Sequence, residues 1–175
     1  MGNKKTMNVV YAAVIAALYV VLTYAQEAIL PGFTSGSVQF RLSESLTMLA
    51  LFTPAAIPGL TIGCVLSNLM NAGAMPIDML VGSLATLFAA LVMYKCRKIR
   101  FKGIPFVSAL MPAIFNGVFV GWELEVFIIE GPFHFASFLT QAGLVALGEL
   151  AVLFVLGIPL SMVIEKRGIA KKLFG

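Results

Sequence analysis

The stretch VVYAAVIAALYVVLTYA, residues 9–25, contains no charged side chain and is long enough to cross most of a lipid bilayer as a helix. Comparable apolar runs recur along the chain of 175 residues, of which 60% are hydrophobic and 11% are charged. Soluble domains carry roughly 25% charged residues, so their surfaces are far more polar than this. The chain is therefore predicted to be an all-α integral membrane protein, folded as a single domain over residues 1–175.

Outward from this first run, apolar segments alternate with short turn-rich segments and predict six transmembrane helices. We expect these helices at residues 9–25, 43–52, 55–70, 77–93, 106–122 and 135–164. The second is short, because a bilayer core of about 30 Å needs about 20 helical residues. It should therefore either extend further at its start or be sheltered by neighbouring helices.

The basic residues are concentrated beside apolar runs. Eleven of the twelve lysine and arginine residues fall within residues 4–5, 95–102 and 166–172. This is the positive-inside pattern of a membrane protein, so the net charge of +4 does not indicate nucleic-acid binding. Even numbers of predicted helices separate the three clusters. The sequence therefore predicts a multi-pass protein of the cell membrane with both termini in the cytoplasm.

Motifs of catalysis and metal binding are missing from the sequence. His134 is the only histidine, and Cys64 and Cys96 have no metal-ligand spacing. There is no P-loop, GxSxG or HExxH motif. We therefore expect a protein that is not an enzyme and that carries neither a metal nor a cofactor.

Polar residues at membrane depth form the candidate substrate-binding site. They are Arg41, Glu44, Asn68, Asn71, Asp78, Asn116, Trp122, Glu123 and Glu149. At a rise of 1.5 Å per residue from the basic ends of their helices, Asn116 lies at about 16 Å and Glu149 at about 24 Å. Because ionisable groups in lipid are costly, they usually mark a substrate path or an ion pair. The sequence predicts a polar cup that opens outward.

Each of these residues also has a simpler interpretation. Arg41 and Glu44 could form a structural ion pair, and Asp78 could be a favourable charge at a helix N-terminus. The two asparagines that end the third helix could join neighbouring helices. Glu123 could belong to a solvated loop. Glu149 is hardest to explain structurally, because it lies well inside an apolar helix with no basic residue near it in sequence.

Small residues also recur on the first helix, where Ala12, Ala13, Ala16 and Ala17 form two pairs with i, i+4 spacing. Small side chains at this spacing allow a second helix to approach closely. The second helix could belong to this chain or to a partner protein, and the alanines alone do not distinguish the two.

Two segments carry a resemblance that covers nearly the whole chain. VQFRLSESLTML (residues 38–49) and GELAVLFVLGIPL (residues 148–160) resemble the queuosine-precursor transporter family. That family usually reads close to VQVRISEALT in the first segment, so Phe40, Leu42 and Ser45 depart from it without changing the polar positions. The six short helices, the alanine pairs and the outer polar cup look like the substrate-binding (S) component of an energy-coupling-factor transporter.

The resemblance implies a ligand and partners. The ligand would be a deazaguanine, either queuine or its aminomethyl precursor, and the partners a transmembrane T component and two cytosolic ATPases. The alanine pairs would then face the partner. Glu149 or Glu44 could accept hydrogen bonds from the donor edge of the ring, and Asn68, Asn116 or Arg41 could donate to its acceptors. Trp122 could stack on the ring, and a cationic arm would favour Asp78 or Glu123.

Three other functions stay open at this point. The chain could bind a different vitamin as an S component. It could be a structural subunit of a membrane complex, in which the buried polar residues pair only with one another. It could also be an intramembrane enzyme, whose turnover would depend on Glu149 or Asp78.

Overall fold

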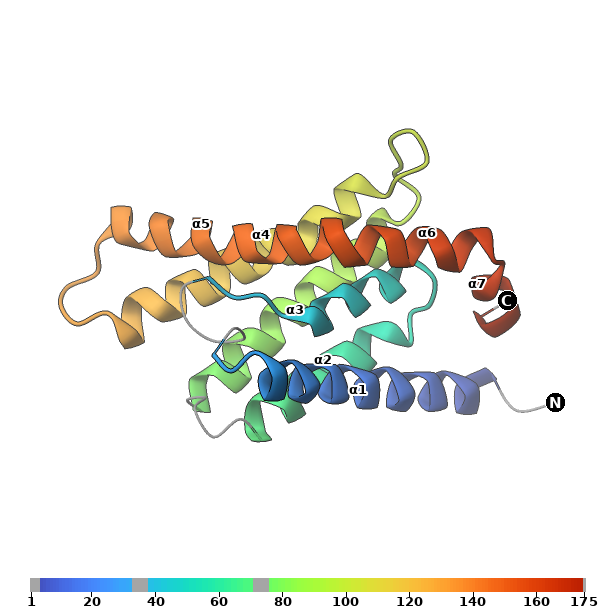
Figure 1. Cartoon of the computed structure of the whole chain (residues 1–175), viewed down its shortest axis with the longest axis horizontal. Coiled ribbons are helices and arrows are strands. Elements are labelled where there is room, and N and C mark those ends of the chain that lie inside the picture. Colours follow the sequence, from blue (N-terminus) through green and yellow to red (C-terminus); the bar gives the residue numbers. More distant parts are fainter. Residues whose placement is uncertain (1–3, 33–37, 71–75, 175) are drawn as a thin grey trace.

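The computed structural model describes residues 4–32, 38–70 and 76–174, and its named elements are all helical (Figure 1). In chain order they are α1 (Lys4–Ile29), the 3-10 helix η1 (Leu42–Leu51), α2 (Ala56–Met70), α3 (Pro76–Cys96), α4 (Phe106–Glu123), the π-helix η2 (Leu124–Ile128), α5 (Phe135–Val152), the π-helix η3 (Leu153–Gly157), α6 (Ile158–Lys166) and α7 (Ile169–Phe174). The predicted all-α fold is confirmed for the described residues.

Four continuous helices among the described residues are long and apolar enough to cross a membrane. They run over Lys4–Ile29, Pro76–Cys96, Phe106–Ile128 and Phe135–Lys166, and they match the first, fourth, fifth and last predicted spans. The remaining two predicted spans correspond to shorter apolar helices, Leu42–Leu51 and Ala56–Met70. The number of crossings therefore stays a prediction, although all six apolar segments are helical.

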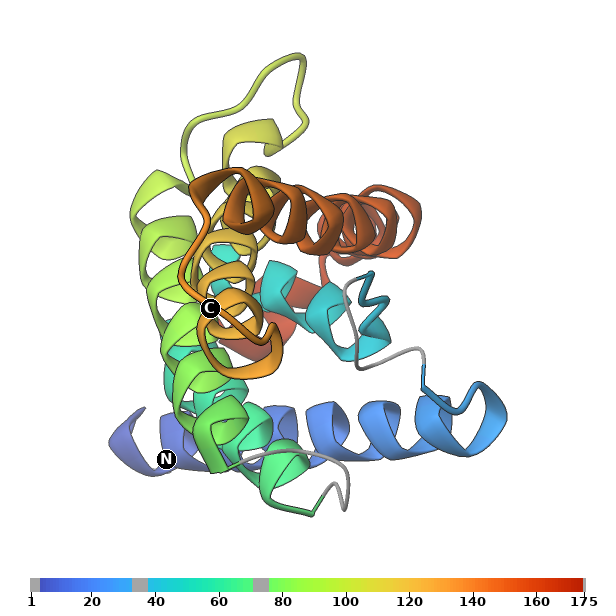
Figure 2. The same ribbon diagram turned by 90° about the vertical axis from the view of Figure 1, so that its left-hand side faces the viewer.

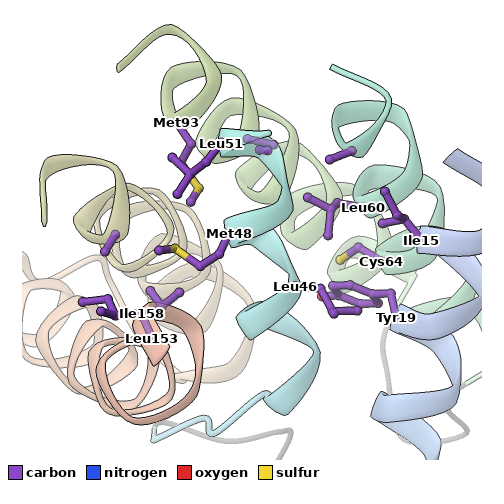
Figure 3. Close-up of a cluster of buried hydrophobic side chains, with 14 residues drawn as sticks. Ile15, Tyr19, Leu46, Met48, Leu51, Leu60, Cys64, Met93, Leu153 and Ile158 are labelled. Atoms are coloured by element: carbon purple, nitrogen blue, oxygen red, sulfur yellow. The ribbon is translucent and has the colours of Figure 1, made fainter. Parts of the chain in front are cut away.

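The short segment η1 is sheltered and lies in the middle of the bundle. It contacts each of the helices α1 to α6, and Figure 2 shows it surrounded by them. Eight of its ten residues are buried. Met48 and Leu51 pack among Leu60, Met93 and Leu153 in the apolar core, which Figure 3 shows on both sides of the segment. Of the two expectations for this segment, shelter by neighbouring helices is the one that the structure shows.

Glycines bring neighbouring helices unusually close. A Cβ atom at Gly59 of α2 would lie 2.7 Å from the Ala12 carbonyl oxygen of α1. At Gly121 of α4 it would lie 2.6 Å from the Ala142 Cα of α5. Lipid gives apolar helices little reason to associate, so this close backbone packing is a main source of helix association.

The long C-terminal helix contains a local widening before a proline. Pro159 has no backbone N–H, and its ring would collide with the carbonyl of Val155 in a regular α-helix. The π-helix η3 (Leu153–Gly157) lies directly before it and lengthens the hydrogen-bond spacing at this point. The helix can therefore continue through the proline to Lys166.

The three basic clusters lie at one end of the bundle, where Figure 1 also shows both termini. Arg100, after α3, forms an ion pair with Glu165 at the end of α6, with two N–O separations of 2.5 and 2.7 Å. The Tyr11 hydroxyl of α1 donates to the carbonyl of Leu173, and its ring meets Phe174 edge-on. This common end is what the positive-inside pattern requires of a chain with both termini on one side.

Cysteine labelling tests the predicted topology. In a background carrying Cys64→Ser and Cys96→Ser, Lys98→Cys and Lys172→Cys should react with a membrane-impermeant maleimide only after the cells are opened. Glu130→Cys, from the opposite end of the bundle, should react in intact cells and serves as the matched control. Labelling of Lys98→Cys in intact cells would contradict the six-helix topology.

Candidate substrate-binding site

Residues 38–41 lie before η1 as non-helical backbone. Such backbone is tolerated inside a membrane protein only where other protein groups satisfy it or where it lines a water-filled cavity. The Gln26 side chain of α1, only 3% exposed, supplies two partners. Its Nε2 donates to the carbonyl of Phe40, and its Oε1 accepts the backbone N–H of Leu42 at 2.7 Å. We call these two hydrogen bonds the Gln26 clamp; it fixes the residues on both sides of Arg41.

Helix α5 covers the same segment from another side. A Cβ atom at Gly148 would overlap the carbonyl oxygen of Gln39, so no other residue type fits there without displacing the backbone. Glu149 follows Gly148 directly and is 1% exposed. The close approach of α5 therefore fixes the position of Glu149 relative to the segment that carries Arg41 and Glu44.

Glu44 lies at the first turn of η1 and is fully buried. The Tyr19 hydroxyl of α1 donates to its Oε1 at 2.5 Å, and the Thr86 hydroxyl of α3 donates to the same atom at 3.4 Å. Its second oxygen, Oε2, is buried and has no hydrogen-bond partner. The carboxyl group of Glu44 is therefore held by two helices and keeps one acceptor atom unused.

Asn116 of α4 and Glu149 of α5 form a second buried pair. The amide nitrogen of Asn116 donates to Oε1 of Glu149 at 2.9 Å, and both residues are at most 2% exposed. Asn116 Oδ1 and Glu149 Oε2 are buried without partners. Glu149 lies near enough to Glu44 for the two carboxyl groups to influence each other, so both belong to one region of the interior.

Arg41 provides the positive charge of this region. Its electrostatic partners include both Glu44 and Glu149. The absence of a side chain at Gly82 of α3 leaves room beside it, because a Cβ atom there would lie 3.7 Å from an Arg41 guanidinium nitrogen and 3.2 Å from Asn68 Nδ2. Asn68 in turn donates to the carbonyl of Asp78 at 3.1 Å and joins α2 to α3.

Glu123 and Asp78 form a carboxyl pair at the ends of α4 and α3. Glu123 is 3% exposed, and its carboxyl group lies close to that of Asp78. Arg41 also interacts electrostatically with Glu123. Oε1 of Glu123 is buried and unpartnered. The polar interior thus contains two carboxyl groups around Asn116 and a further pair at Glu123.

Comparison with known proteins now decides the family. A family model described as "QueT transporter" matches residues 9–166. The chain is also 35% identical over 162 residues to the "Queuosine precursor transporter QueT" of Lactococcus lactis subsp. cremoris (strain MG1363), covering 89% of this chain and 90% of that protein. The chain belongs to the QueT transporter family.

Family membership confirms the resemblance that the two sequence segments carry. A QueT family protein with several apolar helices is a multi-pass protein of the cell membrane, and its role is transport rather than catalysis. No solved structure matches the chain.

The structure gathers most of the predicted site residues of this QueT family member. The half-buried Arg41 lies in one region with the buried residues Glu44, Asn116 and Glu149, and Asn68 borders this region beside Arg41. The predicted residues Asp78 and Glu123 form the adjacent carboxyl pair, and Asn71 lies outside the described residues.

Trp122 is the predicted residue that the structure sets apart from this region. It is 43% exposed, packs edge-on against Phe127 and lines an apolar groove between α3 and α4 with Leu80 and Phe119. The neighbouring Glu123 is buried because successive residues of a helix point about 100° apart. Ring stacking by Trp122 receives no support from this placement.

The alanines of α1 divide into two faces. The carbonyls of Ala12 and Ala16 lie against Gly59 and Gly63 of α2, so these alanines serve internal packing. Ala13 and Ala17 are exposed. The packing interpretation is therefore confirmed for Ala12 and Ala16, whereas a partner contact at Ala13 and Ala17 stays a prediction.

Three residues of the polar interior were absent from the sequence prediction: Tyr19, Gln26 and Thr86. Tyr19 and Gln26 share one face of α1 with the packing alanines, because Ala12, Ala16, Tyr19 and Gln26 follow at i+4, i+7 and i+14. That periodicity is a signal that could have identified the two α1 residues. Thr86 has no comparable signal, because its role depends on a partner 42 residues away.

The Gln26 clamp gives a stability prediction. Gln26→Leu preserves bulk but leaves the buried carbonyl of Phe40 and the N–H of Leu42 without partners, at about 1–3 kcal/mol for each group. The purified variant should therefore melt well below the wild type in detergent. Tyr24→Leu, on the outer side of the same helix, is the matched control and should melt near the wild type. Equal melting of wild type and Gln26→Leu would show that the clamp contributes nothing.

Proposed function

We propose that this QueT family protein is the substrate-binding (S) component of an energy-coupling-factor importer. It captures a queuosine precursor, queuine or the aminomethyl-deazaguanine, from outside the cell. A transmembrane T component and two cytosolic ATPases then drive its release inward. The curated relative named as a queuosine precursor transporter and the polar interior of this chain support the proposal.

One observation supports the proposal most strongly: the buried polar atoms that lack a hydrogen-bond partner in this region are all acceptor oxygens. Glu44 Oε2, Asn116 Oδ1 and Glu149 Oε2 are all buried oxygens without a hydrogen-bond partner. Leaving such acceptors unpaired is costly, and a ligand that brings N–H donors removes that cost. The edge of a deazaguanine ring carries a ring N–H beside an amino group, which a carboxylate can accept through both oxygens.

The ring also has an acceptor side, for which this interior offers donors. Arg41 carries five N–H donors, and Asn68 directs its amide nitrogen to the Asp78 carbonyl and to Cys64 Sγ. They lie together beside Gly82, on the side of the interior formed by α2 and α3. A ring held between this side and the Glu149 side would meet donors and acceptors in the pattern that it presents. Neither a purely apolar vitamin nor an anionic one would match the unpaired oxygens.

The orientation in the membrane forms part of the same proposal. With six crossings and the basic end in the cytoplasm, Glu123 and Asp78 lie toward the outer surface and η1 enters from outside. Ligand would then enter past the Asp78–Glu123 pair and bind above the apolar core formed around Met48 and Leu51.

The exposed alanines supply the contact to the T component. Ala13 borders an apolar groove between α1 and α2, together with Pro58 and Ile62. A helix of the partner can approach here closely, because the groove is lined by small side chains at the α1 surface. Ala17 continues the same exposed face by one turn.

Substitution of Glu149 tests the ligand-binding role. Glu149→Gln keeps the shape of the side chain but exchanges one acceptor oxygen for a donor group. Binding should weaken by about 1.5–3 kcal/mol, the scale of hydrogen bonds to a charged group. This is about 10- to 150-fold in the dissociation constant for queuine and for the aminomethyl precursor, measured by titration calorimetry. Near-wild-type affinity for both ligands in a well-folded variant would remove Glu149 from the site.

Substitution of the exposed alanines tests the partner surface. Ala13→Trp or Ala17→Trp should abolish ATP-dependent uptake, because a bulky side chain blocks helix approach, while ligand binding by the isolated protein persists. Leu18→Trp, on another exposed part of α1, is the control and should support uptake. Loss of ligand binding with intact assembly would instead assign these alanines to internal packing.

A further inference from the structure

We infer that the basic end of the bundle contains a binding site for the headgroup of an anionic phospholipid. An open cavity of about 470 Å³ lies there, within the range of roughly 300–1,000 Å³ that small-molecule sites occupy. It is lined by the end of η1, the segment after α3, the end of α6 and α7, which Figure 1 shows beside both termini. We call it the basic cavity. It shares no lining residue with the polar interior, so the inference is independent of the proposed function.

The charges around the basic cavity are mostly positive. Its basic lining residues are Arg97, Lys98 and Arg100, which follow α3, and Lys171 of α7. Its one acidic lining residue, Glu165, is already paired with Arg100 at 2.5 Å. Lys98 and Lys171 are exposed and form no ion pair with another described residue. Three positive charges from two distant parts of the chain therefore meet in one cavity without a carboxylate partner in the described part of the chain.

Two contacts hold the basic groups in place. Arg97 Nη1 donates to the carbonyl of Tyr94 at 2.6 Å, and the guanidinium carbon lies 3.9 Å from the centroid of the Tyr94 ring. A guanidinium group has five N–H donors, so others remain for a phosphate group. The contact of Tyr11 with Leu173 holds α7 against α1 and keeps Lys171 at the cavity. Little side-chain freedom is therefore lost at Arg97 when an anion binds.

The apolar part of the lining favours a lipid over a free phosphate ion. Leu51 and Phe52, at the inner end of η1, and Phe174 of α7 line the same cavity as the basic residues. A phospholipid combines a phosphate, which suits the basic residues, with glycerol and acyl groups, which suit an apolar wall. A free phosphate would leave that wall in contact with water. Basic pockets between the helices of membrane proteins bind anionic headgroups in this way.

The neighbouring side chains favour a lipid over an acidic segment of a partner protein. Ile99 and Phe101 alternate with the basic residues after α3 and are 53% and 71% exposed. Large apolar side chains between lysine and arginine residues are typical of a segment that lies in the lipid interface. The phosphates of the surrounding lipids lie at the same depth, so the ligand of the basic cavity is at hand in the membrane.

Native mass spectrometry of the purified full chain in a neutral detergent tests the inference. The probes are phosphatidylglycerol, phosphatidylcholine with the same acyl chains, and inorganic phosphate. The wild type should bind one phosphatidylglycerol about 10- to 100-fold more tightly than phosphatidylcholine, and equimolar inorganic phosphate should not displace it. Each lysine or arginine near an anionic lipid contributes about 1 kcal/mol, or about 5-fold in affinity. Lys98→Gln combined with Lys171→Gln should therefore weaken phosphatidylglycerol binding about 25-fold.

The matched control is Lys102→Gln combined with Lys172→Gln. It removes the same charge from the same two basic clusters, but neither residue lines the basic cavity, so lipid affinity should stay near that of the wild type. All four lysines are exposed, so both double variants should melt near the wild type.

Four results would overturn the inference. Equal affinity for the two lipids would show that the cavity does not select a charged headgroup. Equal weakening by both double variants would reduce the effect to general surface charge. Displacement of the lipid by equimolar inorganic phosphate would assign the cavity to a free phosphate. Loss of ATP-dependent uptake with unchanged lipid affinity in the Lys98→Gln, Lys171→Gln variant would assign it to an acidic segment of a partner protein.

Discussion

The structure depends on one constraint: a stretch of non-helical backbone lies inside a membrane protein and must find its hydrogen bonds there. The Gln26 clamp supplies partners for the Phe40 carbonyl and the Leu42 N–H, and the Glu44 N–H donates to the Arg41 carbonyl. Gly148 lets α5 pack directly against the backbone of Gln39. The 3-10 helix η1 then continues inward among all the surrounding helices α1 to α6. Small residues let α1 approach α2 and let α4 approach α5 closely. The resulting compact bundle encloses η1.

The same constraint brings the polar residues together. The non-helical residues 38–41 and the short helix η1 place Arg41 and Glu44 in the interior. There α4 and α5 contribute Asn116 and Glu149. Burying each of these polar groups is unfavourable in free energy. Contacts within the chain offset only part of this desolvation, because some acceptor oxygens stay unpaired. A transporter benefits from such a balance. In the proposed function, a ligand that donates to these oxygens would complete the network and make the occupied protein more stable than the empty one.

Much of the fold follows from the sequence because lipid imposes simple rules. Apolar length and the basic clusters predict the four long helices, and the clusters do lie at one end. The 3-10 form of η1 could not be read from LSESLTMLAL, since it depends on contacts with six helices rather than on local preference. Glu149 stood out because a lone carboxyl group in an apolar helix has few structural explanations. Thr86 did not, since it acts through Glu44, 42 residues away in the chain.

The central claim is that the buried oxygens of this chain recognise a deazaguanine. Native mass spectrometry of the purified protein, incubated with an equimolar mixture of the aminomethyl-deazaguanine, queuine, guanine, riboflavin, thiamine and biotin, tests it most directly. We expect one bound molecule per chain with the mass of the aminomethyl-deazaguanine or queuine. A bound mass belonging to one of the vitamins, or a spectrum of the folded protein with no ligand bound, would contradict it.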